Sequence, residues 1–599
     1  MNNTAGSLCL VGSKTRKEAS VISRLRNAGA IILGKANMSQ WGNSRSSPKS
    51  QSNGWSAWGG QTLGAFYPNQ DPCGSSSGSA VAMSLDLAAF TVGVETVGSM
   101  ICPASRNNVV GIKTTSGLVA RDNVIVTNMR GSIGPFAKTV RDAAIALSIM
   151  AGKNTEDPLS QEIPFESTPD YEKACKLADF RSVRLAIPQN AFQNPFVQSM
   201  NLSAIKKDFE IVVSSFRGHG ATIIDDVNYS SYDRINGPSA PQQYVGPAEY
   251  KSDMAHYFRG LEINPLNIQN IDDMISCTKS IPPEDYPSRD ISYWDTVRNA
   301  DDVLSEKVVA GIIEMRYLGG AGGIDQVLDA SGADAIILPS IVSADVPGLV
   351  GYPIITVPMG FSPSDTPVTL NERGNLVWDG PNIPYGLSFI GRPYSEERLI
   401  ELAYTFEQSI RSKSEDTDTS TATFQTEINH FMSIPWCRSH LCEPNFQPID
   451  KPREATPDNG HTLLGKTWFT KDTIPHLLTL YRQPSVTEGL RGEIRRFHTL
   501  GTGLNEHPNI FHGGAIAAVL DGALGVLIRR AMPDGGPAYT VALNITYKKA
   551  IKTPETVMVR SWITKSEGRK IWGSARIESG IGEIYATAEG IFVKAIAKI

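Results

Sequence analysis

Short apolar segments alternate with amphipathic stretches through the first two thirds of the chain. Their spacing predicts a helix running into a strand over 17–35, a small-residue helix over 77–88 and a strand over 87–96. Further elements follow the same rule: a helix over 140–152, strands over 333–340 and 352–360, and a helix over 395–408. Strands that alternate with helices indicate an α/β layer architecture. The centre, about 155–330, is polar and shows no clear period.

The pattern changes at residue 412. Residues 412–427, SKSEDTDTSTATFQTE, are polar and aperiodic, which is typical of a linker. One apolar helix is then predicted over 513–532, followed by alternating segments over 539–551, 555–566, 570–579 and 583–595. A helix followed by antiparallel strands predicts a second, α+β domain. We therefore expect a domain over 1–411, a linker over 412–455 and a domain over 456–599.

Composition and charge exclude several classes of partner. The chain has 599 residues, 41% hydrophobic and 20% charged, as expected of a globular protein with more than one domain. A net charge of −5 provides no basic surface for nucleic acid. No stretch reaches the roughly 18 apolar residues of a membrane span, and the N-terminus lacks the apolar core of a signal peptide. We predict a cytoplasmic protein that binds neither nucleic acid nor a membrane.

The seven cysteines are scattered and show no zinc-type CxxC pairing. We therefore predict reduced thiols, with Cys73 and Cys102 acting as small buried apolar residues. No metal-ligand cluster, nucleotide loop or prosthetic-group motif is evident, so we expect neither a metal nor a cofactor.

A run of small residues, DPCGSSSGSA at 71–80, is either a flexible linker or a loop whose backbone approaches something closely. It contains Ser75, and Ser99 lies in a second small-residue turn, VETVGSM. A serine nucleophile needs a base. Only His219 and His256 precede the linker, and neither stands beside an acid in a recognisable pattern. This disfavours a Ser-His-Asp triad and suits a serine–lysine relay.

Several spaced motifs carry a resemblance over residues 1 to about 410: GKANMSQW, GWSAWGGQT, DPCGSSSGSA, GVETVGSMICPASRNNVVGIKTTSGLV and IPYGLSFIGRPYSEERLI. In this order they resemble the amidase signature family, notably its fungal branch. The resemblance implies an α/β amidase-signature fold, a mixed sheet covered by helices, that hydrolyses amide bonds with a Ser–Ser–Lys triad. It assigns the acylated nucleophile to Ser99 and the bridging serine, held on a cis peptide bond, to Ser75. It assigns the oxyanion hole to the backbone N–H groups of Thr96, Val97, Gly98 and Ser99.

The chain departs from the family pattern in two places. The family's catalytic lysine lies in a Lys-Asp pair upstream of the stretch matching NNTAGSL, and no residue here corresponds to it. Lys35 and Lys113 occupy positions without that role in the family. We therefore expect an amidase whose activity is lowered by several orders of magnitude, because neither serine has an evident proton acceptor. The second departure is Val97, where the family usually has Gly or Asp.

A second group of candidate residues lies in EHPNIFHGGAIAAVLDGALG, residues 506–525. Free N–H groups at a helix start polarise a carbonyl. Asp521 lies in an otherwise apolar run, where burying an acid is costly without a reason. A carboxylate at this position is suited to activating water.

Together with residues 543–577, this stretch resembles a hotdog-fold acyl-CoA thioesterase over about 460–599. The resemblance implies an α+β hotdog domain, with a curved antiparallel sheet around a long helix, that forms a homo-oligomer with sites at the subunit interface. It assigns the catalytic acid to Asp521, an assisting role to Thr540 and the thioester-carbonyl turn to His512, Gly513 and Gly514. Gly522 stands where many relatives carry Glu.

Three hypotheses remain open. In the first, the chain is a hydrolase with two sites, one for a small-molecule amide and one for an acyl-CoA thioester. In the second, only the thioesterase is active and the amidase domain is an inactive scaffold. In the third, the chain is a non-catalytic binding protein or an artefactual gene fusion. The presence of Ser75, Ser99 and Asp521 argues against the third.

Overall fold

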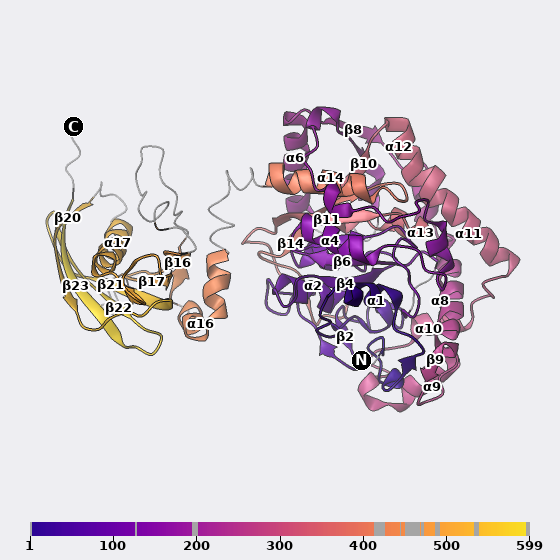
Figure 1. Cartoon of the computed structure of the whole chain (residues 1–599), viewed down its shortest axis with the longest axis horizontal. Helices are drawn as coiled ribbons and strands as arrows, with labels where there is room; N and C mark the ends of the chain where they lie inside the picture. Colours follow the sequence, from indigo (N-terminus) through magenta and orange to yellow (C-terminus); the bar gives the residue numbers. More distant parts are fainter. Residues whose placement is uncertain are drawn as a thin grey trace. The chain divides into compact units, whose positions relative to one another are not determined.

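The computed structural model describes residues 3–125, 129–194, 202–411, 426–443, 445–449, 468, 472–484, 492–531 and 538–594. The chain divides into two compact units, Met1–Ser412 and Lys413–Ile599 (Figure 1). Each unit has its own sheet and its own apolar core.

The first unit is built on an eight-stranded mixed sheet. In spatial order its strands are β4 (Thr91–Glu95), β6 (Ser132–Ala137), β5 (Val110–Lys113), β11 (Ile354–Phe361), β14 (Pro384–Ile390), β10 (Ala335–Pro339), β7 (Arg184–Pro188) and β8 (Thr222–Val227). Only the β10–β7 and β7–β8 pairs are parallel. Every residue of β5, β6, β10 and β14 is buried, as expected where both faces of a sheet are covered.

Helices cover this sheet (Figure 1). They are α1 (Ser20–Asn27), α2 (Ser77–Ser84), α3 (Ile101–Arg106), α4 (Val140–Met150), α6 (Ser203–Gly218), α7 (Tyr232–Ile235), α8 (Gln242–Arg259), α9 (Ile271–Ser280), α10 (Ser292–Arg298), α11 (Glu306–Gly319), α12 (Asp325–Ser331), α13 (Asp345–Val350) and α14 (Glu396–Thr405). Short strands pair beside the sheet: β1 (Lys14–Thr15) with β9 (Leu261–Ile263), β2 (Trp55–Ser56) with β3 (Gly60–Gln61), and β12 (Thr369–Leu370) with β13 (Val377–Asp379).

Neighbouring residues of β5 show how both faces are filled. A Cβ on Gly111 would lie 2.8 Å from the Cβ of Ala104 in α3, so this glycine lets the helix sit directly on the strand. Ile112 points to the opposite face, since side chains alternate along a strand. There it joins the apolar cluster that includes Val140 of α4 and Leu399 of α14. The predicted mixed sheet covered by helices is confirmed.

One predicted strand is not formed. Residues 30–38 have no regular secondary structure, and within the described ranges no strand pairs with them. Apolar residues of this segment are consequently exposed, Ile31 by 85% and Leu33 by 73%. A short apolar run forms a strand only where a neighbouring strand completes the hydrogen-bond ladder.

The second unit is an antiparallel sheet with one long helix against it (Figure 1). Its strands follow in the order β15 (Gln447–Pro448), β16 (His476–Arg482), β17 (Glu493–Leu500), β21 (Glu555–Glu567), β22 (Lys570–Glu578), β23 (Ile584–Lys594) and β20 (Ala538–Tyr547). The helix is α17 (Gly513–Ala531), preceded by the pair β18 (Asn505–His507) and β19 (Ile510–Phe511). Its buried face joins the core formed with the sheet. The predicted α+β hotdog domain is confirmed.

Part of the stretch expected to be a linker is folded. Residues 426–433 are helical, and α16 (Pro435–Leu441) follows them. Phe431 and Cys437 from these turns pack against Leu478 and Phe497 of the sheet. The polar composition of 412–427 therefore does not continue to 455. Apolar residues resume at 428, and Phe431 and Cys437 among them are buried. Residues 412–425 and 450–467 lie outside the described residues.

The prediction of reduced thiols is wrong for four cysteines. Cys9 pairs with Cys277, and Cys73 pairs with Cys102, as disulfides. The partners are separated by 268 and 29 residues, and sequence spacing alone does not reveal such pairings. The free cysteines are Cys175, Cys437 and Cys442. Among the described residues, no helix is long and apolar enough to cross a membrane.

Candidate functional sites

The small-residue run at 71–80 is a folded loop and not a linker. The Gly74–Ser75 peptide bond is cis, and Ser75 is buried just before α2. A Cβ on Gly74 would lie 2.2 Å from Ser39 Oγ and 2.8 Å from Asn53 Oδ1, so only glycine fits there. The Ser39 N–H donates to the Ser75 carbonyl at 3.0 Å.

Ser99 lies in the tight turn between β4 and α3. Gly98 adopts a φ of 74°, a left-handed conformation that glycine tolerates without strain. The Ser99 carbonyl accepts a 3.0 Å hydrogen bond from the Ser76 N–H, which joins the two serine-bearing segments directly. In the part of the chain that the structure describes, the N–H groups of Thr96, Val97 and Ser99 donate no hydrogen bond. They remain available to an oxygen atom of a substrate.

A buried carboxylate accepts hydrogen bonds from the backbone that follows this turn. Glu95, the last residue of β4, is fully buried, and its Oε2 accepts the N–H groups of Met100 at 2.6 Å and Ile101 at 2.8 Å. Burial raises the pKa of Glu95, while Lys113 and the N–H groups of Ile101, Met100 and Gly98 oppose that rise. The Gly98 N–H thus faces Glu95. The sequence analysis did not identify Glu95, although it directly precedes the turn.

Lys113 is fully buried on β5, and its Nζ donates to the Tyr352 carbonyl at 2.8 Å. Burial lowers the pKa of Lys113 to about 8, although Glu95 and Glu396 oppose that shift. A buried structural role therefore fits this lysine. It makes no hydrogen bond to Ser75 or Ser99.

Other lysines near the N-terminus do not serve the serines either. Lys17 pairs with Glu156, and Lys35 Nζ donates to Asn3 Oδ1 at 3.0 Å. Within the described ranges, no lysine or histidine forms a hydrogen bond with the side chain of Ser75 or Ser99. Among the described residues, the turn at Ser99 thus has free N–H donors and no basic side chain hydrogen-bonded to Ser75 or Ser99.

Val97 is 45% exposed at the tip of the turn. A Cβ on Gly348 would lie 2.5 Å from Val97 Cγ2, so a glycine in α13 makes room for the larger side chain. The departure at Val97 is accommodated by packing and leaves the backbone of the turn in place.

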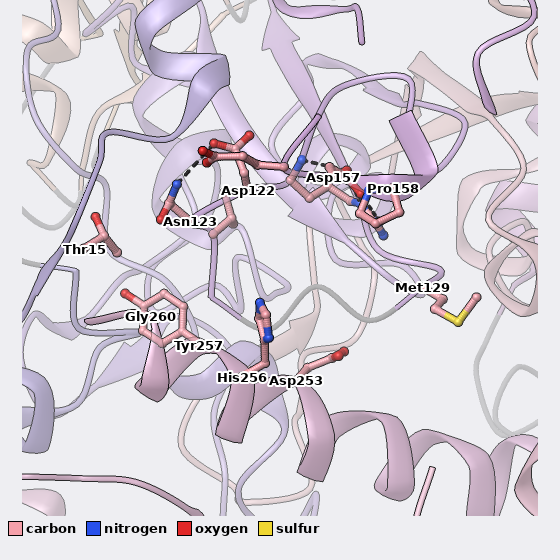
Figure 2. A pocket seen from close by; sticks show the side chains of 13 residues that line it. Thr15, Asp122, Asn123, Met129, Asp157, Pro158, Asp253, His256, Tyr257 and Gly260 are labelled. Atoms are coloured by element: carbon pink, nitrogen blue, oxygen red, sulfur yellow. Dashed lines mark hydrogen bonds and ion pairs between the residues drawn. The ribbon is translucent and has the colours of Figure 1, made fainter. Parts of the chain in front are cut away.

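A separate cavity of about 260 Å³ lies beside α8 (Figure 2). Asp253 and His256 project from α8 on one side, and Asp122 and Asn123 lie on the other. Neither Ser75 nor Ser99 lines it. Among the described residues, Asp253 Oδ2 is buried and has no hydrogen-bond partner. Burial, and then the nearby Glu249, raise the pKa of Asp253 to about 7.

This carboxyl group is expected to cost stability near neutral pH. Between about pH 4 and 7 the unfolded chain has released the Asp253 proton while the folded chain retains it, so stability falls as pH rises through this window. Since one pKa unit is worth about 1.4 kcal/mol, Asp253→Asn is expected to stabilise the first unit by up to about 4 kcal/mol at pH 8 and to have little effect at pH 4. Thermal unfolding at both pH values checks this, with the exposed Asp226→Asn as a control. Equal effects of Asp253→Asn at the two pH values would contradict it.

In the second unit, His512 immediately precedes α17. Its Nδ1 accepts the Gly514 N–H at 2.8 Å, and the Gly513 carbonyl accepts the Tyr547 hydroxyl at 3.0 Å. The predicted turn therefore starts the helix as expected. The imidazole of His512 occupies the Gly514 N–H in this conformation.

Asp521 lies farther along the same helix and is partly buried. The Thr540 hydroxyl on β20 donates to Asp521 Oδ1 at 2.9 Å. Asp521 and Gly514 share a helix face two turns apart, which separates them by about 10.5 Å along the axis. The structure thus brings Asp521 and Thr540 together but keeps both away from the turn at His512.

The chain belongs to the amidase family. The family model "Amidase" matches residues 1–314, and the model "Thioesterase superfamily" matches residues 508–584. The two matches bear out the fusion indicated by the sequence. Amidase-type hydrolases act on C–N bonds, and the second match adds a thioesterase-type domain.

Individual proteins agree with this assignment. A protein of Arthroderma benhamiae named as an amidase is 37% identical over 422 residues, covering 69% of this chain and 69% of that protein. A protein of Arabidopsis thaliana that is likewise named as an amidase is 31% identical, over 68% of this chain and 73% of that protein. The solved peptide amidase of Stenotrophomonas maltophilia superposes with a TM-score of 0.59 at 30% identity, covering 69% of this chain and 80% of that chain.

Proposed function

We propose that the first unit hydrolyses a small-molecule amide through Ser99. The observation that carries this proposal is the turn at Ser99, held against the Ser75 loop by the hydrogen bond from Ser76, with three backbone N–H groups free. Ser99 Oγ attacks the amide carbonyl, and the N–H groups of Thr96, Val97 and Ser99 stabilise the oxyanion.

In this scheme Ser75 accepts the proton of Ser99 while its own proton passes to the nitrogen of the leaving amine, and water then hydrolyses the acyl-enzyme. No basic side chain of the described residues contacts Ser75 to assist this transfer. Release of arylamine from aryl amides by the purified chain tests the proposal. Failure to detect release that depends on Ser99 would contradict it.

For the second unit we infer hydrolysis of an acyl-CoA thioester. Asp521 activates water, Thr540 holds the carboxylate in place, and the turn of His512, Gly513 and Gly514 binds the thioester carbonyl once the His512 ring releases the Gly514 N–H. An attacking water must lie within hydrogen-bond reach of the carboxylate and next to the carbonyl carbon. The 10.5 Å separation within one subunit, about two helical turns, is too long for this.

The proposed thioesterase site therefore needs a second copy of the chain. An isologous dimer would bring Asp521 of one copy to the helix start of the other. Strand β20 is the edge of its sheet, and Tyr539 and Val541 on it are each 64% exposed. An apolar edge strand is a surface on which another strand pairs.

Val541→Glu is expected to produce a monomer with at least about tenfold less thioesterase activity, because a charge on the edge opposes strand pairing. Light scattering after gel filtration and an acyl-CoA assay measure the two effects. Ile581→Glu is the matched control, since Ile581 is 93% exposed in the turn between β22 and β23. An active Val541→Glu monomer would contradict the dimeric site.

The predicted cytoplasmic location rested on reduced cysteines. Disulfides persist mainly in oxidising compartments. With four cysteines paired, we infer an oxidising environment for the folded chain in place of the cytoplasm.

A further inference from the structure

The Cys73–Cys102 disulfide lies between the two serine-bearing segments. Cys73 is two residues before Ser75, and Cys102 is three residues after Ser99 in the first turn of α3. The disulfide closes a short covalent path between the two serines. Without it, the chain connects them only through α2 and β4.

We propose that this disulfide is a positioning element of the serine site, so that thiol–disulfide exchange controls its reactivity. This inference rests on the proposed amide hydrolysis at Ser99. Neither cysteine touches the reacting atoms in this scheme. They act by fixing where the Ser75 loop stands relative to the Ser99 turn.

The backbone around Cys73 is held in a demanding conformation. Cys73 has a φ of 58°, which is uncommon outside glycine, and its N–H donates to Asp71 Oδ1 at 2.8 Å. The Cys73 carbonyl accepts the Ser77 hydroxyl from α2. A residue in this conformation persists only where its surroundings hold it, and the covalent bond to Cys102 is one of those restraints.

The two segments are also joined by the apolar cluster of Ala80 and Met83 with Met100 and Ala104, and by individual hydrogen bonds. Ser76 N–H binds the Ser99 carbonyl, Ser76 Oγ accepts the Val94 N–H at 3.2 Å, and Asn107 Nδ2 donates to the Pro72 carbonyl at 2.9 Å. Each contributes modestly by itself. Removing the covalent link is therefore expected to let the loop and the turn drift relative to each other.

The exchange step balances with a dithiol as reductant. A thiolate of the dithiol attacks a disulfide sulfur, with Cys102 more accessible than Cys73, and the Sγ–Sγ bond breaks. The second thiol of the reductant then displaces the remaining cysteine and closes the reductant's own cyclic disulfide. The dithiol thus loses two electrons, and Cys73 and Cys102 become two free thiols.

The chain provides a matched control. Cys9–Cys277 also joins distant segments, the turn at Leu8–Leu10 to α9, but it lies outside both serine segments. Removing either disulfide loosens the fold. Only removal of Cys73–Cys102 is expected to change the serine site specifically.

The test compares the full chain with the double variants Cys73→Ser/Cys102→Ser and Cys9→Ser/Cys277→Ser. Thiol titration of the denatured, unmodified chain comes first. We expect three thiols, from Cys175, Cys437 and Cys442. Seven thiols would overturn the proposal at once.

Hydrogen exchange then measures the stability of the backbone around the two serines, and covalent labelling measures the reactivity of Ser99. In Cys73→Ser/Cys102→Ser, the N–H groups of Ser76, Met100 and Ile101 are expected to exchange at least about tenfold faster. Labelling of Ser99 by an aryl fluorophosphonate, with ethylamine as base, is expected to slow by about 10²-fold, as small misplacements of reacting groups do. Treating the unmodified chain with dithiothreitol is expected to slow the labelling of Ser99 in the same way, and reoxidation is expected to restore the labelling rate.

Unchanged exchange at these N–H groups in Cys73→Ser/Cys102→Ser, or an equal effect of Cys9→Ser/Cys277→Ser, would overturn the proposal. If the unmodified chain is never labelled at Ser99, the proposed amide hydrolysis fails, and the exchange rates still decide whether the disulfide positions the two segments.

Discussion

Adding a small primary amine such as ethylamine is expected to raise the rate of aryl-amide hydrolysis by the chain by about 10²-fold. Ser99 has donors for the oxyanion and a neighbouring serine, but no base contacts Ser75 among the described residues. A free amine beside Ser75 takes the proton that Ser75 relays. Arylamine release against amine concentration, at a pH near the amine's pKa, measures the effect.

The gain is expected to disappear in Ser99→Ala, because the amine then has no hydroxyl to activate. Triethylamine, of similar basicity but larger, is expected to rescue poorly. Ser276→Ala is a suitable control variant, since its Oγ bonds only the Asp272 carbonyl within α9. Rapid hydrolysis that depends on Ser99 without added amine would show that another base serves the site, with the buried Lys113 the first residue to replace.

Replacing Asp521 with asparagine is expected to lower acyl-CoA hydrolysis by at least about 10²-fold. The amide keeps the hydrogen bond from Thr540 but accepts no proton from water. Thr540→Val is expected to cost less, because it removes only the bond that orients the carboxylate, and Thr540→Ser is expected to restore the rate. Release of free CoA thiol measures each variant.

The exposed Glu567→Gln removes a carboxylate elsewhere in the second unit and is expected to leave the rate unchanged. Full thioesterase activity in Asp521→Asn would assign the water activation to a different group. Asp521→Asn leaves the helix and its neighbours in place. If it loses activity while its unfolding temperature stays unchanged, a loss of stability does not explain the lower rate.

The serine loops were identified through the resemblance to the amidase signature family, since the small-residue run at 71–80 fits a linker equally well by itself. Glycines at 74 and 98 are required by a close approach and by a positive φ, and such positions leave a visible signature. The helix with His512 at its start was predictable from the sequence, since its apolar period is long and its capping turn is distinct.

The central region, about 155–330, was not predictable from its pattern. It contains α6 to α12 and strands β7, β8 and β9. Helix α8 shows why: it buries Tyr250, Tyr257 and Glu249 and carries Pro247 inside the helix. Polar and aromatic residues in buried positions hide the 3.6-residue period on which a sequence-based prediction depends.

Contacts between distant segments were also beyond the sequence. The two disulfides depend on tertiary approach. The same holds for the cavity beside Asp253, whose lining comes from separate parts of the chain. No local pattern encodes these contacts.

The most direct test of two independent hydrolytic sites is one parallel assay. The unmodified chain, Ser99→Ala and Asp521→Asn are each given an aryl amide with ethylamine and, separately, an acyl-CoA. We predict that Ser99→Ala loses only arylamine release and that Asp521→Asn loses only CoA release. A substitution that abolishes both activities, or neither, would contradict the assignment of one hydrolytic site to each unit.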